Sequence, residues 1–289
     1  MYTHTPVLVD ETIQFLGPKP GNRFIDATLG AGGHTLAILE RTLPDGRVLG
    51  IDQDETALAN AKATLESFGS RVVFVHSNFR VVRMIAETYG FLECDGVLAD
   101  LGISSMMVDD PSRGFSFMHE GPLDMRMDRS QALTAAEVVN TYSEKEIADI
   151  IYTFGEERRS RRIARSIVRS RPLQRTTDLV RSVERVAGGA RYGQIHPATR
   201  TFQALRIYVN DELRSLEDFI DSSMAVVRSG GRVVVIAFHS LEDRIVKQRF
   251  RMSAVPGRVL TKKIVSANDD EVRRNPRARS AKLRAWERS

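Results

Sequence analysis

Cysteine and clusters of metal ligands are nearly absent from this sequence of 289 residues. The one cysteine, Cys94, excludes an intrachain disulfide, and it leaves no cysteine cluster for zinc or an iron–sulfur centre. The six histidines never stand at the spacing of metal ligands. The sequence therefore predicts no metal site.

Long apolar runs are also missing. No stretch approaches the roughly 18 apolar residues that cross a bilayer, and residues 1–6 show no basic segment that leads into an apolar run. We therefore expect a soluble, cytoplasmic protein with no membrane partner. Hydrophobic residues make up 42% and charged residues 27% of the chain, which is typical of a globular protein with a buried core.

Positive charge is concentrated in one part of the chain. Residues 158–206 contain thirteen arginines, no lysine and two acids, a net charge of +11, whereas the whole chain carries +5. A basic block on a mildly acidic body favours a surface for a polyanion such as a nucleic acid. The alternative is a solvated helical surface.

Strand and helix patterns alternate through the first hundred residues. The expected strands are 23–26, 47–52, 72–75 and 95–100, and the expected helices are 35–43, 54–68 and 79–89. This alternation predicts a parallel sheet with helices on both faces.

The alternation stops after about residue 104, and no convincing strand follows before 197. Ser143 and Glu146 form a capping box ahead of an apolar helical stripe, with Gly155 where a C-cap belongs. Arginines at helical spacing over 158–169 then predict a helix with one basic face. This segment is expected to contain helices and loops.

Sheet patterns return near the C-terminus. A long helix over 202–220 is followed by a β-branched strand over 232–238 and a helix over 241–252, and late strands over 259–265 and 282–286 are expected to pair antiparallel at the sheet edge. The predicted fold is α/β, with one domain formed by 1–103 and 198–289 and an all-helical insertion formed by 104–197. We interpret the insertion as an RNA-recognition domain.

A glycine loop lies between the first expected strand and helix. It runs from Asp26 to His34, and Thr35 stands where a dinucleotide fingerprint would have its third glycine. An acid before the loop would repel a pyrophosphate, but it suits the sulfonium and ammonium of S-adenosyl-L-methionine. The loop therefore favours that cofactor over NAD.

Two further acids end expected strands. Asp52, 22 residues after Gly30, is placed to accept both ribose hydroxyls of an adenosine. The alternative role is capping the next helix, for which Asp54 is equally well placed. Asp100 ends the fourth strand, and ligands of open α/β sheets bind beyond such ends. Three acids at strand ends are hard to explain by packing, because buried unpaired carboxylates are costly.

Long motifs in a fixed order point to a known family. They are His4–Leu8, Asp26–His34, Asp100–Ser105, Arg113–Met118, Gly121–Met127, Tyr152–Arg158, His196–Gln203, Phe238–Arg244 and Asn275–Ser280. With these motifs the chain resembles the bacterial 16S ribosomal RNA cytosine-N4 methyltransferases, the RsmH (MraW) family, over nearly its whole length.

The resemblance implies a class I, Rossmann-like methyltransferase with a mostly parallel seven-stranded sheet and an inserted helical domain. It implies contacts with S-adenosyl-L-methionine at Gly32, Gly33, His34, Asp52, Phe79 and Asp100. The family usually has a cofactor-contacting glutamine at the position of Met107. The methionine loses that side-chain hydrogen bond. We therefore expect Met107 to contact the cofactor through its backbone or by van der Waals packing.

The implied reaction is methylation of the exocyclic N4 amine of a cytidine in the decoding region of 16S rRNA, within the small ribosomal subunit. We hypothesise that Asp100, or the backbone after it, accepts hydrogen bonds from this amine; its alternative role is holding cofactor. The target base must leave its stack, and Phe115, Phe117 and Phe238 are candidates to stack on it, with core packing as the alternative.

The candidate RNA contacts share charged or polar side chains. They are Asp124, Arg126, Arg162, Arg165, Arg200, His239, Arg277 and Arg279.

Three rival interpretations of the function remain. A NAD-dependent oxidoreductase is disfavoured by Asp26 and Thr35, a non-catalytic ribosome-assembly factor by the intact glycine loop, and a small-molecule methyltransferase by the arginine block. The sequence does not indicate an oligomeric state.

Overall fold

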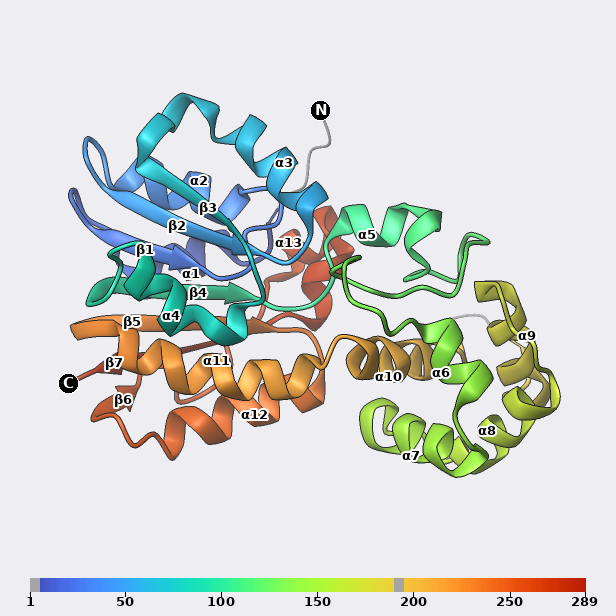
Figure 1. Ribbon diagram of the computed structural model, residues 1–289. Coiled ribbons are helices and arrows are strands. Elements are labelled where there is room, and N and C mark those ends of the chain that lie inside the picture. The colour runs from blue at the N-terminus through green and yellow to red at the C-terminus, as the bar shows by residue number, and fades with distance from the viewer. Residues whose placement is uncertain (1–5, 190–194) are drawn as a thin grey trace. The chain divides into compact units, whose positions relative to one another are not determined.

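The computed structural model describes residues 6–189 and 195–289. The chain forms two compact units, shown in Figure 1. The first consists of Met1–Gly102 and Leu213–Ser289, and the second is the continuous segment Ile103–Glu212. None of the helices in the described residues is both long and apolar enough to span a membrane.

A seven-stranded sheet in the order β3-β2-β1-β4-β5-β7-β6 forms the centre of the first unit. The strands are β1 (Arg23–Asp26), β2 (Arg47–Asp52), β3 (Val72–His76), β4 (Cys94–Asp100), β5 (Val227–Ala237), β6 (Gly257–Val259) and β7 (Lys282–Arg288). Strands β1 to β5 pair in parallel, and β7 pairs antiparallel with both β5 and β6. The predicted mostly parallel α/β fold is confirmed.

Alternating apolar residues of the central strands face two different cores. On β4, Val97 and Ala99 belong to one core and Leu98 to the other, as a period of two requires. Helices α4 (Val82–Thr88), α11 (Glu212–Val226) and α12 (Ser240–Arg251) cover the first face. Helices α1 (Val9–Leu16), α2 (Gly33–Arg41) and α3 (Glu55–Thr64) cover the opposite one, so the sheet is buried between two helical layers (Figure 1).

The shorter elements of this unit lie in its connections. They are the 3-10 helices η1 (Glu66–Arg71), η2 (Phe79–Val81) and η4 (Pro276–Ser280), and the helix α13 (Asp269–Arg274).

The second unit is helical around its own apolar core. It contains α5 (Ser105–Asp109), η3 (Pro111–Arg113), α6 (Ala135–Thr141), α7 (Glu144–Gly155), α8 (Ser160–Arg169), α9 (Thr176–Ala187) and α10 (Thr199–Val209). The capping box of α7 is confirmed, since the Ser143 hydroxyl accepts the Glu146 N–H at 3.2 Å and the Glu146 carboxylate accepts the Ser143 N–H at 2.8 Å.

The prediction that Gly155 caps α7 was wrong. The left-handed cap is Glu156 at φ 48°, and Gly155 is the last helical residue. A Cβ on Gly155 would lie 2.6 Å from the Arg200 carbonyl oxygen on α10. Glycine is therefore required there by the close approach of two helices.

The long helix predicted after Pro197 is two helices. Helix α10 ends at Val209, and α11 begins at Glu212 after Asp211 at φ 47°. The Asn210 side chain accepts the Met127 N–H at 2.7 Å and donates to the Met125 carbonyl at 2.8 Å, which holds the break against the helical unit.

The predicted insertion 104–197 is therefore too short at its C-terminal end. The helical unit extends to Glu212 because Phe202 and Leu205 of α10 bury their side chains in its core.

The predicted late strand over 259–265 differs from the structure. Strand β6 ends at Val259, and Val265 forms only an isolated bridge with Leu283.

Candidate active site

Three carboxylates end three adjacent strands of the sheet. Asp26 ends β1, Asp52 ends β2 and Asp100 ends β4. Because β2, β1 and β4 are consecutive and parallel, all three acids lie at one sheet edge. The tertiary structure thus brings together the acids that the sequence singled out.

Asp52 holds the glycine loop in place. Its carboxylate accepts the Gly30 N–H at 2.8 Å and the Asp54 N–H at 2.9 Å. The N-cap of α3 is Asp54, which accepts the Thr56 N–H at 3.1 Å, so the capping alternative for Asp52 is wrong. Burial raises the pKa of Asp52 to about 6, against the opposing effect of its two backbone hydrogen bonds.

Two glycines of the loop are required by geometry. Gly32 precedes α2 at φ 86°, where a side chain is strained, and a Cβ on Gly33 would lie 2.8 Å from Pro6. Gly32 has no side chain to cap α2, so the first N–H groups of that helix are left for a ligand.

Asp26 is buried and hydrogen-bonded within the loop. It accepts the Thr35 hydroxyl at 2.7 Å and the Thr28 N–H at 3.2 Å. Burial raises the pKa of this carboxyl, against the opposing charge of His34. Thr35, which breaks the dinucleotide fingerprint, is therefore the hydroxyl that satisfies the buried acid of the loop.

His34 and Asp100 form a buried polar pair. His34 Nε2 lies 3.5 Å from Asp100 Oδ2, and the Asp100 N–H donates to the Thr28 hydroxyl oxygen at 2.6 Å. Burial opposes the charged imidazole, yet Asp100 and Asp26 more than offset it and raise the pKa of His34. Both His34 ring nitrogens and Asp100 Oδ1 are buried without a hydrogen-bond partner among the described residues. Such atoms indicate a polar ligand.

The other two predicted cofactor residues have apolar neighbours. Phe79 begins η2, and its ring packs edge-to-face on Phe219 at 5.1 Å between centroids. Met107 is buried in the core of the helical unit, and its N–H donates to the Ser104 hydroxyl at 3.2 Å. Their cofactor contacts stay predictions.

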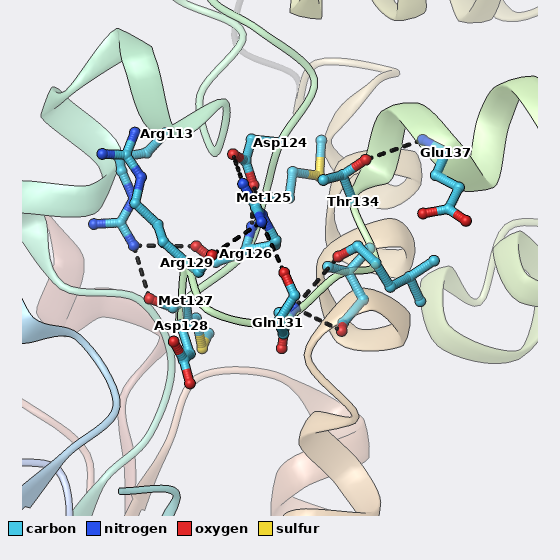
Figure 2. A network of polar contacts seen from close by, with 12 residues as sticks. Arg113, Asp124, Met125, Arg126, Met127, Asp128, Arg129, Gln131, Thr134 and Glu137 are labelled. Atoms are coloured by element: carbon cyan, nitrogen blue, oxygen red, sulfur yellow. Dashed lines mark hydrogen bonds and ion pairs between the residues drawn. The ribbon is translucent and has the colours of Figure 1, made fainter. Parts of the chain in front are cut away.

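Asp124 and Arg126, predicted as RNA contacts, belong to an internal network shown in Figure 2. Arg126 donates twice to the Asp124 carboxylate, at 2.7 and 2.9 Å, and also to the carbonyls of Arg129 and Gln131. Burial acts to raise the pKa of Asp124, but Arg126 holds it below its usual value. Four of the five N–H groups of Arg126 are thus used to fix this loop.

The remaining arginines differ in how firmly they are held. Arg162 is exposed on α8 and has no side-chain partner within 6–189 and 195–289, whereas Arg165 donates to Glu144 at 3.3 Å. Arg200 donates to the Glu156 carbonyl at 3.4 Å. Arg162 is the freest of these three for an external phosphate.

The last three candidates lie on the first unit. His239 is the N-cap of α12 and forms a capping box with Glu242, in which its Nδ1 accepts the Glu242 N–H at 3.4 Å, whereas its Nε2 is buried without a hydrogen-bond partner among the described residues. Arg277 and Arg279 lie on η4, the former half-buried and the latter exposed.

The base-stacking candidates pack internally. Phe115 is buried, Phe117 packs on Phe202 and His196 at 5.2 and 4.7 Å, and Phe238 is packed against the core that contains Leu98.

Sequence reasoning missed two site residues, Thr28 and Thr35. Their hydroxyls bond to Asp100 and Asp26 respectively. The signal available was their spacing, two and nine residues after Asp26, but a threonine just after a strand or in the first turn of a helix is too common to mark a site by itself.

Comparison with known proteins supports one assignment. A family model described as the MraW methylase family matches residues 1–289. A protein of Nostoc named ribosomal RNA small subunit methyltransferase H is 51% identical, covering 100% of this chain and 93% of its own. The Sorangium cellulosum protein of the same name is 53% identical, covering 99% and 90%.

A solved structure shows the same fold. It is a Clostridium thermocellum protein named provisionally as an rRNA-methylase, which aligns over 100% of both chains with a TM-score of 0.50 at 13% identity.

Proposed function

The chain belongs to the MraW methylase family, and from that premise we propose that it methylates the exocyclic N4 amine of a cytidine in the decoding region of 16S rRNA. The relatives from Nostoc and Sorangium cellulosum support methylation of small-subunit rRNA through their names. The finer assignment, to cytidine N4 in the decoding region, rests on the motif resemblance. An rRNA substrate also implies that the protein acts in the cytoplasm.

The observation that carries this proposal is the buried His34–Asp100 pair with its unsatisfied polar atoms. These atoms lie at the sheet edge that also holds Asp26 and Asp52, next to the uncapped start of α2. S-adenosyl-L-methionine has two cationic groups, a carboxylate and ribose hydroxyls, but no phosphate. An edge with three acids, a histidine and free helical N–H groups fits that combination of groups.

We assign roles by chemistry. The first N–H groups of α2, at Gly33 and His34, would bind the cofactor carboxylate, and Asp52 the ribose hydroxyls. The carboxylates of Asp26 and Asp100 would stabilise the sulfonium and ammonium groups of the cofactor. When bound, the cofactor supplies an electrophilic methyl group.

Asp100 is the proposed catalytic residue. Cytosine N4 is a weak nucleophile because its lone pair is conjugated with the ring, so the enzyme must orient it. Asp100 Oδ1 has no partner among the described residues and can accept an N4–H hydrogen bond. When N4 forms its new bond it becomes cationic and must lose a proton, and the same oxygen is placed to take it. His34 Nε2 lies 3.5 Å from the other carboxylate oxygen.

The helical unit is proposed to recognise RNA. Helix α8 buries Ile163 and Ile167 and exposes Arg161, Arg162 and Arg169 on its other side. These three arginines have no side-chain partner in the described part of the chain, which leaves their guanidinium groups for phosphates. The function of 103–212 as an RNA-binding unit follows from that face.

The test is methyl transfer from radiolabelled S-adenosyl-L-methionine to small subunits isolated from cells that lack this protein. Nucleoside analysis should find the label as N4-methylcytidine in 16S rRNA. Asp100→Asn should bind the cofactor more weakly, and at saturating cofactor it should lose most of the transfer rate, by about 100-fold or more for a carboxylate that acts as general base. Label on another nucleoside would refute the N4 assignment.

Two rival functions give different results. A non-catalytic assembly factor would bind the subunit without transferring label. An oxidoreductase would bind a nicotinamide nucleotide in calorimetry and would give no heat with S-adenosyl-L-methionine.

A further inference from the structure

A second candidate site lies beside β7 and β6, the last two strands in the sheet order. It is a cavity of about 150 Å³ formed by α12, by β6 and the residues after it, and by β7. This volume is many times the roughly 10–15 Å³ that one ordered water needs. In the sheet order β5 lies between β4, which ends at Asp100, and β7, which carries Arg284, so the cavity lies beside a different part of the sheet from Asp100.

The lining is strongly cationic. It includes Lys247, Arg251, Lys262 and Arg284, and it contains no acidic residue. Arg284 is neutralised by Asp243, to which it donates at 2.7 and 3.2 Å. The other three cations are exposed, and the structure of 6–189 and 195–289 gives them no hydrogen-bond or ion-pair partner. The cavity therefore has an uncompensated charge of +3.

Helix stability accounts for only part of this arrangement. Arg251, in the last turn of α12, interacts favourably with the helix dipole. Lys247 stands four residues before it, a spacing at which like charges repel. Arg249, in the same last turn, is held by Glu217 and Asp221 of α11 at 2.9 and 2.8 Å. A cation near the end of α12 can thus be paired, yet those facing the cavity are not.

We propose that this cavity binds a phosphate group of the RNA backbone. The proposal rests on the proposed function, because that function supplies the polyanion. Three cations that line one cavity can give charge-assisted hydrogen bonds to phosphate oxygens, and the buried Phe250 forms an apolar wall of the same cavity. This phosphate contact would anchor RNA on the methyltransferase unit itself, in addition to the contacts proposed for the arginines of α8.

The test removes the three charges together with Lys247→Gln, Arg251→Gln and Lys262→Gln. Binding of 16S rRNA fragments is measured between about 50 and 200 mM salt, together with KM and kcat on small subunits. We expect affinity to fall about tenfold, as for one lost charged contact. The slope of log affinity against log salt should fall in magnitude by about 0.7–0.9, the value for one phosphate. KM for the subunit should rise by a similar factor with kcat unchanged.

A matched triple variant controls for net charge. Lys19, Arg83 and Arg214 are exposed cations of the same unit that do not line the cavity, and their change to glutamine removes the same charge. This control should keep the wild-type salt slope. Calorimetry with S-adenosylhomocysteine should give the same affinity in both triple variants, which confirms an intact fold and cofactor site.

Each outcome has a separate meaning. A cavity variant that matches the control in affinity and salt slope overturns the proposal, even if inorganic phosphate binds to the wild-type cavity. Binding needs no methyl transfer. Wild-type protein that binds rRNA but never methylates it therefore overturns the proposed function alone, and the slope comparison still decides the cavity.

Discussion

Asp52→Asn should strongly reduce the pH dependence of cofactor binding between pH 5 and 7, leaving the contribution of Asp26, whose pKa burial also raises. In the wild type, burial raises the pKa of Asp52 to about 6. The ionised carboxylate is the stronger acceptor for ribose hydroxyls, so affinity should fall as pH drops through 6. The amide cannot ionise, and it also loses one of the two backbone hydrogen bonds that Asp52 accepts from Gly30 and Asp54.

The expected size follows from the titration. With a pKa of about 6, the ionised fraction is ~0.9 at pH 7 and ~0.09 at pH 5, so affinity should fall about tenfold, or ~1.4 kcal/mol. Burial acts to lower the pKa of His34, but Asp100 and Asp26 outweigh it and raise that pKa, which favours the charged imidazole. For the free protein the sign is opposite: a raised carboxyl pKa means that stability falls as pH rises from about 4 to 6.

The assay is calorimetry with S-adenosylhomocysteine. Its sulfur is neutral, so no sulfonium charge contributes to the pH dependence of binding. Wild-type binding at pH 5.5 should release protons, as shown by heats in two buffers of different ionisation enthalpy. Asp54→Asn is the matched control, since Asp54 caps α3 through the Thr56 N–H, and asparagine retains that acceptor. If Asp52→Asn showed the same tenfold change as wild type, the reasoning about Asp52 would be refuted.

Two further predictions concern stability, each measured by urea denaturation of the full chain. Thr35→Val removes the hydroxyl that donates to buried Asp26 at 2.7 Å, and it should lower the free energy of unfolding by about 1–3 kcal/mol. Thr35→Ser keeps the hydroxyl and should cost much less. Equal losses of stability in the two variants would show that the hydroxyl is not the cause. Gly155→Ala places a Cβ 2.6 Å from the Arg200 carbonyl oxygen, and it should lower the free energy of unfolding by about 1–3 kcal/mol. Gly189→Ala is the control, because its Cβ would have no atom nearer than 3.9 Å and its stability should change little. A Gly155→Ala variant as stable as the wild type would refute the close approach of the two helices.

The fold was predictable from local patterns because each strand and helix carries its own period. The strands ending at Asp26, Asp52 and Asp100 were located within a residue or two, and parallel pairing then required their ends to share an edge. The break between α10 and α11 was not predictable, since one apolar stripe runs through both helices. It depends on Asn210, which bonds to residues 83 and 85 positions away.

The candidate site divides in the same way. The sequence alone placed a glycine loop and three acids where a cationic adenosine cofactor would bind, and it carried the motifs of one methylase family. Only the tertiary structure decided which groups are already used: Arg126 by Asp124, His239 by Glu242, and Asp26 by Thr35. It also brought Lys247 and Lys262 to one cavity. Residue type and spacing reveal which chemistry a chain can perform, but hydrogen-bond partners and converging charges depend on segments that meet only when the chain folds.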